Sequence, residues 1–158
     1  MMQGDEGFAS FYATHHAAIW AYLVRLGAPH ALASDLAQDT FVRWLERDAS
    51  GFDGNARAYL YRIALHLFID HARRNKREVA WDVETDVAAP ASSDDAIPQH
   101  VWTRLTMRER QLLWLAYAEG FTHDEIASIT QLASDSIRVL LSRARARFQG
   151  LQEGGGDA

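Results

Sequence analysis

The chain has 158 residues, a formal net charge of −5 and no cysteine. Without cysteine it cannot form disulfides, cysteine-based metal sites or a thiol nucleophile, and its net acidity argues against a general nucleic-acid binder. Residues 1–7 contain acids but no base, and no apolar run approaches the roughly twenty residues of a membrane helix. We therefore expect a soluble, cytoplasmic protein with no membrane insertion, whose 48% apolar residues can build a core.

Apolar residues recur at three- and four-residue spacing almost throughout the chain, which predicts amphipathic helices and no strand. A first helix is expected from about Phe8 to Arg25. It should end at Gly27-Ala28-Pro29, because Gly tolerates left-handed geometry and Pro restricts the residue before it. A second helix is expected from about Ala31 to Arg47, with a buried stripe that includes Trp44 and Leu45.

A third helix is expected to run from Asn55, a plausible N-cap, to about Lys76. Tyr59 belongs to its predicted core face, whereas Tyr61 is the better candidate for exposure. The segment that follows, 78–96, is acidic and ends in small and polar residues. Such a segment buries little surface, so it predicts a flexible linker.

The residues after this linker predict a second helical domain. Thr106 to Glu109 and Thr122 to Glu125 each have the capping-box pattern, in which Thr and Glu side chains satisfy the first backbone amides of a helix. A turn at about 131–133 separates a short helix from a basic last helix, as in a helix-turn-helix. The expected divisions are a first domain at 1–77, the linker at 78–96, a second domain at 97–150 and a disordered tail at 151–158.

The basic residues are concentrated in two segments. Six of the sixteen lie between Arg57 and Arg77, and four more lie between Arg138 and Arg147 without an acid. In the first segment, basic side chains share a helix face and alternate with aromatic residues, which suits single-stranded DNA. In the second segment, the helix could enter a DNA major groove. The alternative for each segment is an ordinary solvated helix face.

Three parts of the chain resemble conserved segments of the sigma-70 family of RNA polymerase sigma factors. Asp35 to Trp44 resembles the polymerase-binding segment, and motifs within 57–74 resemble the promoter-melting segment. Motifs within 108–145 resemble the C-terminal promoter-binding domain. Their order and separation match the family, and the lack of a third domain between them is typical of the extracytoplasmic-function group. The resemblance implies an all-α protein of two small domains that binds core polymerase, opens promoters and is not an enzyme.

The resemblance also implies partners and contact residues, but no cofactor or metal. The partners would be promoter DNA, an anti-sigma factor, the clamp helices of the largest polymerase subunit and the flap region of the second-largest subunit. The implied polymerase contacts are Asp35, Gln38, Asp39, Phe41 and Trp44, of which periodicity gives Phe41 and Trp44 a core role. The implied contacts to the downstream promoter element and its melted strand are Phe52, Asn55, Arg57, Tyr61, Arg62, His66 and Arg73. The implied contacts to the upstream promoter element are Ser134, Arg138, Leu140, Ser142, Arg143 and Arg145.

Departures from the family pattern leave alternatives open. Val139 and Leu140 stand where polar and basic residues are usual, and Leu140 could contact a thymine methyl, meet a partner protein or fill the core. The family often has acidic residues at the positions of Leu32 and Ser34, and this chain does not. One hypothesis is that phosphorylation of Ser34 or Thr40 restores the negative charge. The competing function classes are a conventional helix-turn-helix regulator and a sigma-like interaction protein without promoter recognition. Enzyme classes are disfavoured because the chain has no HExxH motif and no Gly-rich phosphate loop.

Overall fold

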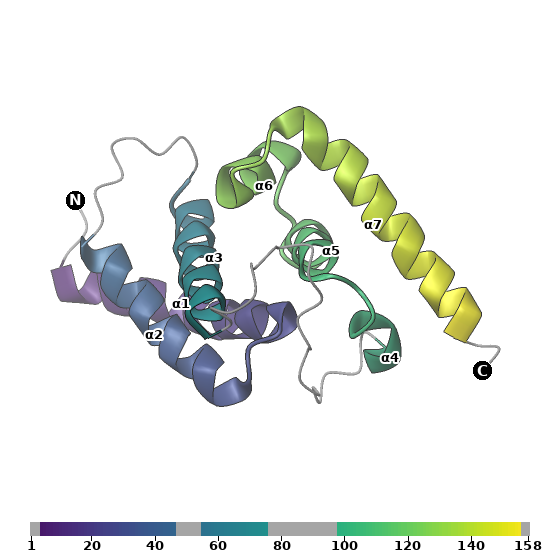
Figure 1. The fold of residues 1–158 in the computed structure, drawn as a ribbon. Helices are drawn as coiled ribbons and strands as arrows, with labels where there is room; N and C mark the ends of the chain where they lie inside the picture. The colour runs from purple at the N-terminus through teal and green to yellow at the C-terminus, as the bar shows by residue number, and fades with distance from the viewer. Residues whose placement is uncertain (1–3, 47–54, 76–97, 156–158) are drawn as a thin grey trace.

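The computed structural model describes residues 4–46, 55–75 and 98–155, and every element in these ranges is helical. A first set of helices consists of α1 (Gly4–Leu26), α2 (His30–Glu46) and α3 (Ala56–Asn75). A second set consists of α4 (Gln99–Trp102), α5 (Met107–Leu113), the π-helical turn η1 (Trp114–Ala118), α6 (His123–Thr130) and α7 (Ser134–Gly155). Figure 1 shows the two sets side by side, which confirms the predicted all-helical fold of two small domains.

Helices α1, α2 and α3 pack around an aromatic core. Phe11 of α1 stacks on Trp44 of α2, with ring centres 4.6 Å apart and ring planes at 17°. Helix α1 ends at the predicted Gly27, whose φ of 126° is a conformation that favours glycine. The prediction that Leu45 is buried is wrong: Leu45 is 58% exposed, because it follows the buried Trp44 in the helix and therefore points about 100° away from it.

Both predicted capping boxes open helices in the second set. Thr106 caps α5 and Thr122 caps α6, and in each case the Glu three residues later completes the box. Gln131 follows α6 with a left-handed φ of 63° and turns the chain into α7. Helix α7 does not end at Gly150 as predicted. The next residue, Leu151, packs against the core and offsets the cost of an internal glycine, about 1 kcal/mol.

Side chains of the second set of helices bind the free carbonyl groups at the C-terminus of α1. The last carbonyls of an α-helix have no partner within the helix. Here the Arg25 carbonyl accepts a hydrogen bond from Trp102 Nε1 at 3.1 Å, and the Leu26 carbonyl accepts one from Arg110 Nη2 at 3.0 Å. Arg110 is fully buried, also donates to the Leu105 carbonyl, and brings a positive charge that favours a helix C-terminus. The two sets therefore share a buried seam.

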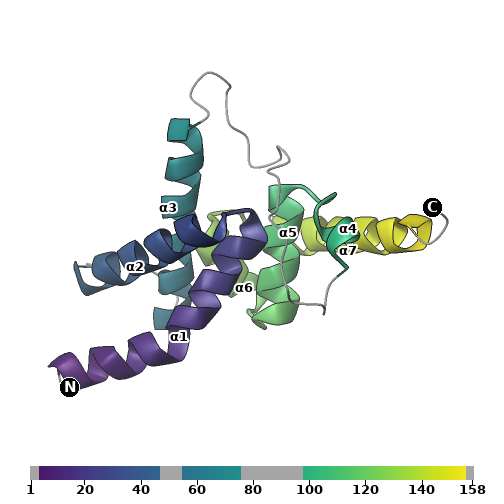
Figure 2. The same ribbon diagram turned by 90° about the horizontal axis from the view of Figure 1, so that it is seen from below.

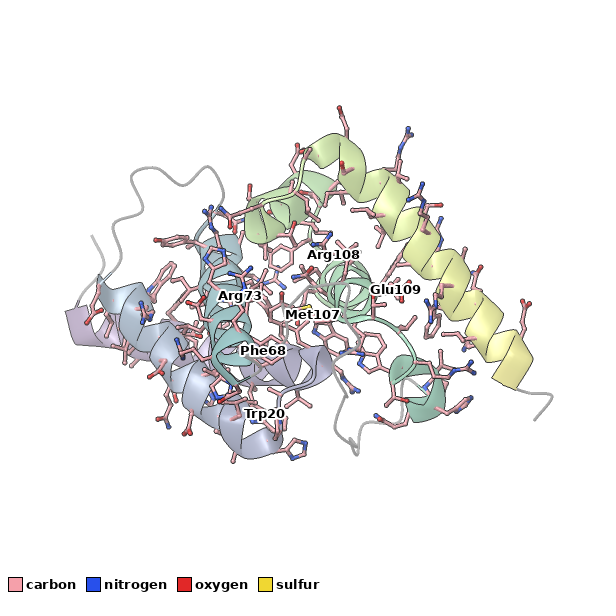
Figure 3. The ribbon with its side chains drawn as sticks, in the orientation of Figure 1. Trp20, Phe68, Arg73, Met107, Arg108 and Glu109 are labelled. Atoms are coloured by element: carbon pink, nitrogen blue, oxygen red, sulfur yellow. The ribbon has the colours of Figure 1, made fainter. Side chains whose placement is uncertain are left out.

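A second part of this seam lies between α3 and α6. Figures 1 and 2 show α6 beside α3 from two directions, with α7 on the side of the second set away from α1–α3. Figure 3 shows Phe68 on α3 and Met107 on α5, both of them buried. It also shows Glu109 on the side of α5 that faces α7, where Arg147 Nη1 lies 3.8 Å from its carboxylate. The predicted linker lies outside the described residues.

Two kinds of feature are not found within the described ranges. No helix there combines the length and the apolarity that crossing a bilayer requires. No three His, Asp or Glu side chains there lie close enough together to share a metal ion.

Candidate nucleic-acid and protein interfaces

One exposed side of α2 collects acidic, polar and apolar residues. Asp35, Gln38 and Asp39, predicted as protein contacts, are all exposed. They lie at helical spacing opposite the buried stripe, so they form one surface. Val42 and Leu45 continue this surface, with exposed fractions of 52% and 58%. We call these five residues the α2 face. Acids beside exposed apolar side chains suit the binding of another protein.

The structure corrects two of the predicted contacts on α2. Phe41 and Trp44 are 2% and 3% exposed and lie in the core of the first set, so a partner cannot reach them there. Val42 was not among the predicted contacts, and Leu45 was predicted to lie in the core. The signal that finds both is their spacing of seven and ten residues from Asp35, which returns to the same helix face.

The phosphorylation hypothesis keeps one of its two sites. Thr40 is fully buried and its hydroxyl donates a 2.7 Å hydrogen bond to the Leu36 carbonyl, so a kinase cannot reach it in the folded chain. Ser34 is exposed.

The first turns of the basic face of α3 are covered by α6 and by the residues on either side of it. Arg57 Nη2 donates to the side-chain carboxylate and to the main-chain carbonyl of Glu119, each at 2.9 Å. The Arg57 guanidinium also lies 4.1 Å from the centre of the Phe121 ring. Further along α3, a 2.8 Å hydrogen bond joins His66 to Gln131. Two predicted strand contacts are therefore occupied by the second set of helices.

Asn55 links the start of α3 to the start of α6. Its Oδ1 accepts a 2.8 Å hydrogen bond from the Ala58 amide, which confirms the predicted N-cap. Its Nδ2 donates at 2.7 Å to the carboxylate of Glu125, the same side chain that completes the capping box of α6. The beginnings of the two helices are thus held together by one amide side chain.

Tyr61 is fully buried, so the prediction that it is exposed is wrong. Its ring centre lies 5.1 Å from the Tyr22 ring and 5.1 Å from the Phe121 ring, which it meets edge-on. Burial, and then the nearby Glu119 carboxylate, raise the pKa of the Tyr61 hydroxyl, which keeps it neutral. The sequence could not show this, because Phe121 comes from the other set of helices.

The far end of the α3 face is more open. Arg73 is exposed near the end of α3 (Figure 3), and Arg62 is half-buried. Phe52, another predicted contact, lies outside the described residues. In this arrangement a nucleic-acid strand could reach the last turns of α3 but not the first.

The outer side of α7 is basic and open to solvent. Arg145 donates a 2.7 Å hydrogen bond to the hydroxyl of Tyr117, and the Ser134 hydroxyl donates at 2.9 Å to Asp124. The predicted upstream contacts found exposed on this helix are Ser134, Arg138, Ser142, Arg143 and Arg145.

The two unusual apolar residues of α7 have different environments. Leu140 is half-buried and packs against the core, which supports the core-filling alternative among its three predicted roles. The DNA contact predicted for Leu140 stays a prediction. Val139 is 46% exposed.

His15 lies at the edge of the seam and should make stability depend on pH. Its pKa is lowered from the ordinary value of 6.5, first by burial and then by the positive charge of Arg57, against an upward effect of Glu119. The unfolded chain therefore binds a proton more readily than the folded chain, so the free energy of unfolding should fall as the pH drops below about 6.5. Urea unfolding at about pH 7.5 and about pH 5.5 measures this. His15→Gln should reduce the difference, and an unchanged difference would contradict the assignment.

The order of these surfaces along the chain matches that of a known family. The family model for sigma-70 region 2 matches residues 11–78, and the model for sigma-70 region 4 matches residues 103–148. The chain belongs to the sigma-70 family. It is a sigma factor of the extracytoplasmic-function type, a group of transcription initiation factors rather than enzymes. This sigma factor binds core RNA polymerase and directs promoter recognition, strand opening and transcription initiation.

Individual relatives cover both regions. The sigma factor is 25% identical over 146 residues to the ECF RNA polymerase sigma factor SigM of Bacillus subtilis, covering 87% of this chain and 90% of that protein. It is 26% identical over 148 residues to the ferric citrate uptake sigma factor FecI of Escherichia coli, covering 87% and 86%. The solved structure of the sigma factor RpoE in complex with the anti-sigma factor NepR from Bartonella quintana has a TM-score of 0.73 and 28% identity, covering 92% and 96%.

Proposed function

We propose that this sigma factor works through three separate surfaces. The α2 face docks on the clamp helices of the largest polymerase subunit, and region 4 contacts the flap region of the second-largest subunit. The basic face of α3 holds the melted strand of the downstream promoter element. The exposed side of α7 reads the duplex of the upstream element. The support for this division is chemical, since α2 offers acids and apolar groups, α3 offers bases with aromatic residues, and α7 offers bases.

The observation that most supports this proposal is that region 4 packs against the first turns of α3 in region 2. Glu119 places a carboxylate on Arg57, where a DNA phosphate would bind, and a guanidinium cannot serve both anions at full strength. Region 4 must therefore move away before the first turns of α3 can hold a strand. The α2 face stays exposed in the closed form, so core polymerase can dock there first. We infer that the closed form is the resting state and that polymerase binding opens it.

A partner that stabilises the closed form would keep this sigma factor inactive. The related RpoE structure is a complex with an anti-sigma factor. This likeness supports an anti-sigma factor as a further partner, which would hold the seam shut, cover the α2 face, or do both.

Transcription with purified core polymerase tests the proposed function. Promoters are first selected from a DNA library with the full chain and core polymerase together. Transcription should start at the selected promoters, and promoter binding should require core polymerase. A conventional helix-turn-helix regulator would instead bind duplex DNA by itself. The proposal fails if the chain neither binds core polymerase nor stimulates transcription at any selected promoter.

A further inference from the structure

Val139 lies at the centre of the outward side of α7. The inward side of this helix is marked by Ile137, Leu141 and Ala144, which are all buried. At about 3.6 residues per turn, Val139 stands nearly opposite these three. A recognition helix presents this outward side to the groove of its DNA. Val139 is therefore placed where base edges, rather than the protein core, would be its neighbours.

The charges around Val139 favour a polyanion as the partner of this surface. Arg138 and Arg143 lie beside it and are both exposed. From residue 136 to residue 152 the chain has no acid. A purely apolar protein surface would leave these guanidinium groups without partners, whereas the backbone of a duplex offers phosphates to them. Duplex DNA is therefore the occupant that satisfies both the arginines and the apolar residue.

The surface around Val139 is hollowed rather than flat. An open hollow of about 590 Å³ runs along the first turns of α7, and its lining includes Val139, Arg145, Tyr117 and His123. The 2.7 Å hydrogen bond from Arg145 to the Tyr117 hydroxyl fixes the position of one cation in it. Tyr117 comes from the π-helical turn η1, a local irregularity of a kind that often marks functional sites. The hollow, the Arg145 guanidinium held by Tyr117 and the apolar side chain of Val139 therefore lie together on this surface.

Among base edges in the major groove, thymine alone carries a methyl group. A valine in a helix has one strongly preferred χ1 rotamer, so its two methyl groups point in a fixed direction and little freedom is lost on contact. Leu140 is half-buried and packs against the core, so Val139 offers the larger free apolar surface on this part of the helix.

We propose that Val139 is a specificity-determining residue that selects thymine at one position of the upstream promoter element by contacting its methyl group. This inference rests on the proposed function, since α7 must first enter the groove. It goes further in assigning one base preference to one side chain.

Replacing single thymines by uracil removes the methyl group and leaves the hydrogen-bonding edge unchanged, which makes it a direct test. Each thymine of the upstream element in a selected promoter is replaced in turn, and holoenzyme affinity is measured with the wild-type chain, Val139→Ala and Val139→Ile. One replacement should weaken binding of the wild-type holoenzyme by about fourfold, as expected for one buried methyl group. Val139→Ile should keep this loss, and Val139→Ala should abolish it.

Two results would overturn the assignment. One is that no thymine replacement weakens binding although the holoenzyme transcribes the promoter normally. The other is that Val139→Ala keeps the full uracil effect. Both results are judged on a promoter that the wild-type holoenzyme transcribes normally, so the proposed function would stand while the role of Val139 would not. Because Val139 is exposed, neither Val139→Ala nor Val139→Ile should disturb folding.

Discussion

Reversing two charges on the α2 face, by Asp35→Arg together with Asp39→Arg, is expected to weaken binding to core RNA polymerase by about 100-fold. Both carboxylates are exposed in the closed form and share one side of the helix. The double reversal therefore turns an acidic docking surface into a basic one and places like charges against the partner. Fluorescence anisotropy of the labelled sigma factor, titrated with core polymerase without DNA, measures the change.

A matched control distinguishes the effect of the α2 face from the effect of overall net charge. Asp70→Arg together with Glu153→Arg makes the same change in charge at exposed positions outside α2. We expect the control to bind core polymerase within about twofold of the wild-type chain, since isolated surface charges contribute little. Equal losses in the two double variants would mean that overall charge governs binding, and would remove the basis for the α2 face.

Replacing the buried Arg110 by Met is expected to lower the free energy of unfolding by about 2 kcal/mol. Met fills a similar volume but donates no hydrogen bond, so the carbonyls of Leu26 and Leu105 lose a partner within a buried seam. Leu26 ends α1 in region 2, whereas Arg110 belongs to region 4. The substitution should therefore also loosen the packing of the two regions. Urea unfolding followed by circular dichroism measures the first effect, and small-angle scattering measures the second.

Arg104→Met is the control for this substitution. Arg104 is an exposed arginine of the same region, and its loss should change stability by no more than about 0.5 kcal/mol. If Arg110→Met were as stable as this control and equally compact, the bonds from Arg110 would not hold the two regions together.

The starts and ends of several helices could be predicted because short-range chemistry sets them. The Thr106 and Thr122 capping boxes, the Asn55 cap and the Gly27 stop all involve groups within a few residues of one another. Periodicity also identified most of the buried stripe of α2. It failed at Leu45, which is next to Trp44 in the sequence but belongs to the exposed α2 face.

The seam could not be predicted from the same patterns. Arg57 and Glu119 are 62 positions apart in the sequence, and no local motif links them. Tyr61 shows the consequence, because its burial depends on Phe121 of the other region. The family resemblance identified the segment of α2 that binds the polymerase, but it did not show which of its side chains point to solvent. The resemblance made Phe41 a polymerase contact, whereas helical periodicity made it a core residue, and the structure agrees with the periodicity.

The most direct test of whether region 4 must leave α3 before a promoter opens is to join the two regions chemically. His66 and Gln131, whose side chains share a 2.8 Å hydrogen bond, are replaced by cysteine in a chain that has no other cysteine. A short, reducible bismaleimide then links them. The linked sigma factor should bind core polymerase yet form no open promoter complex, while each singly modified variant should form one. Reduction of the linker should restore opening. Open complexes formed by the linked sigma factor as readily as by the single variants would contradict the closed resting state.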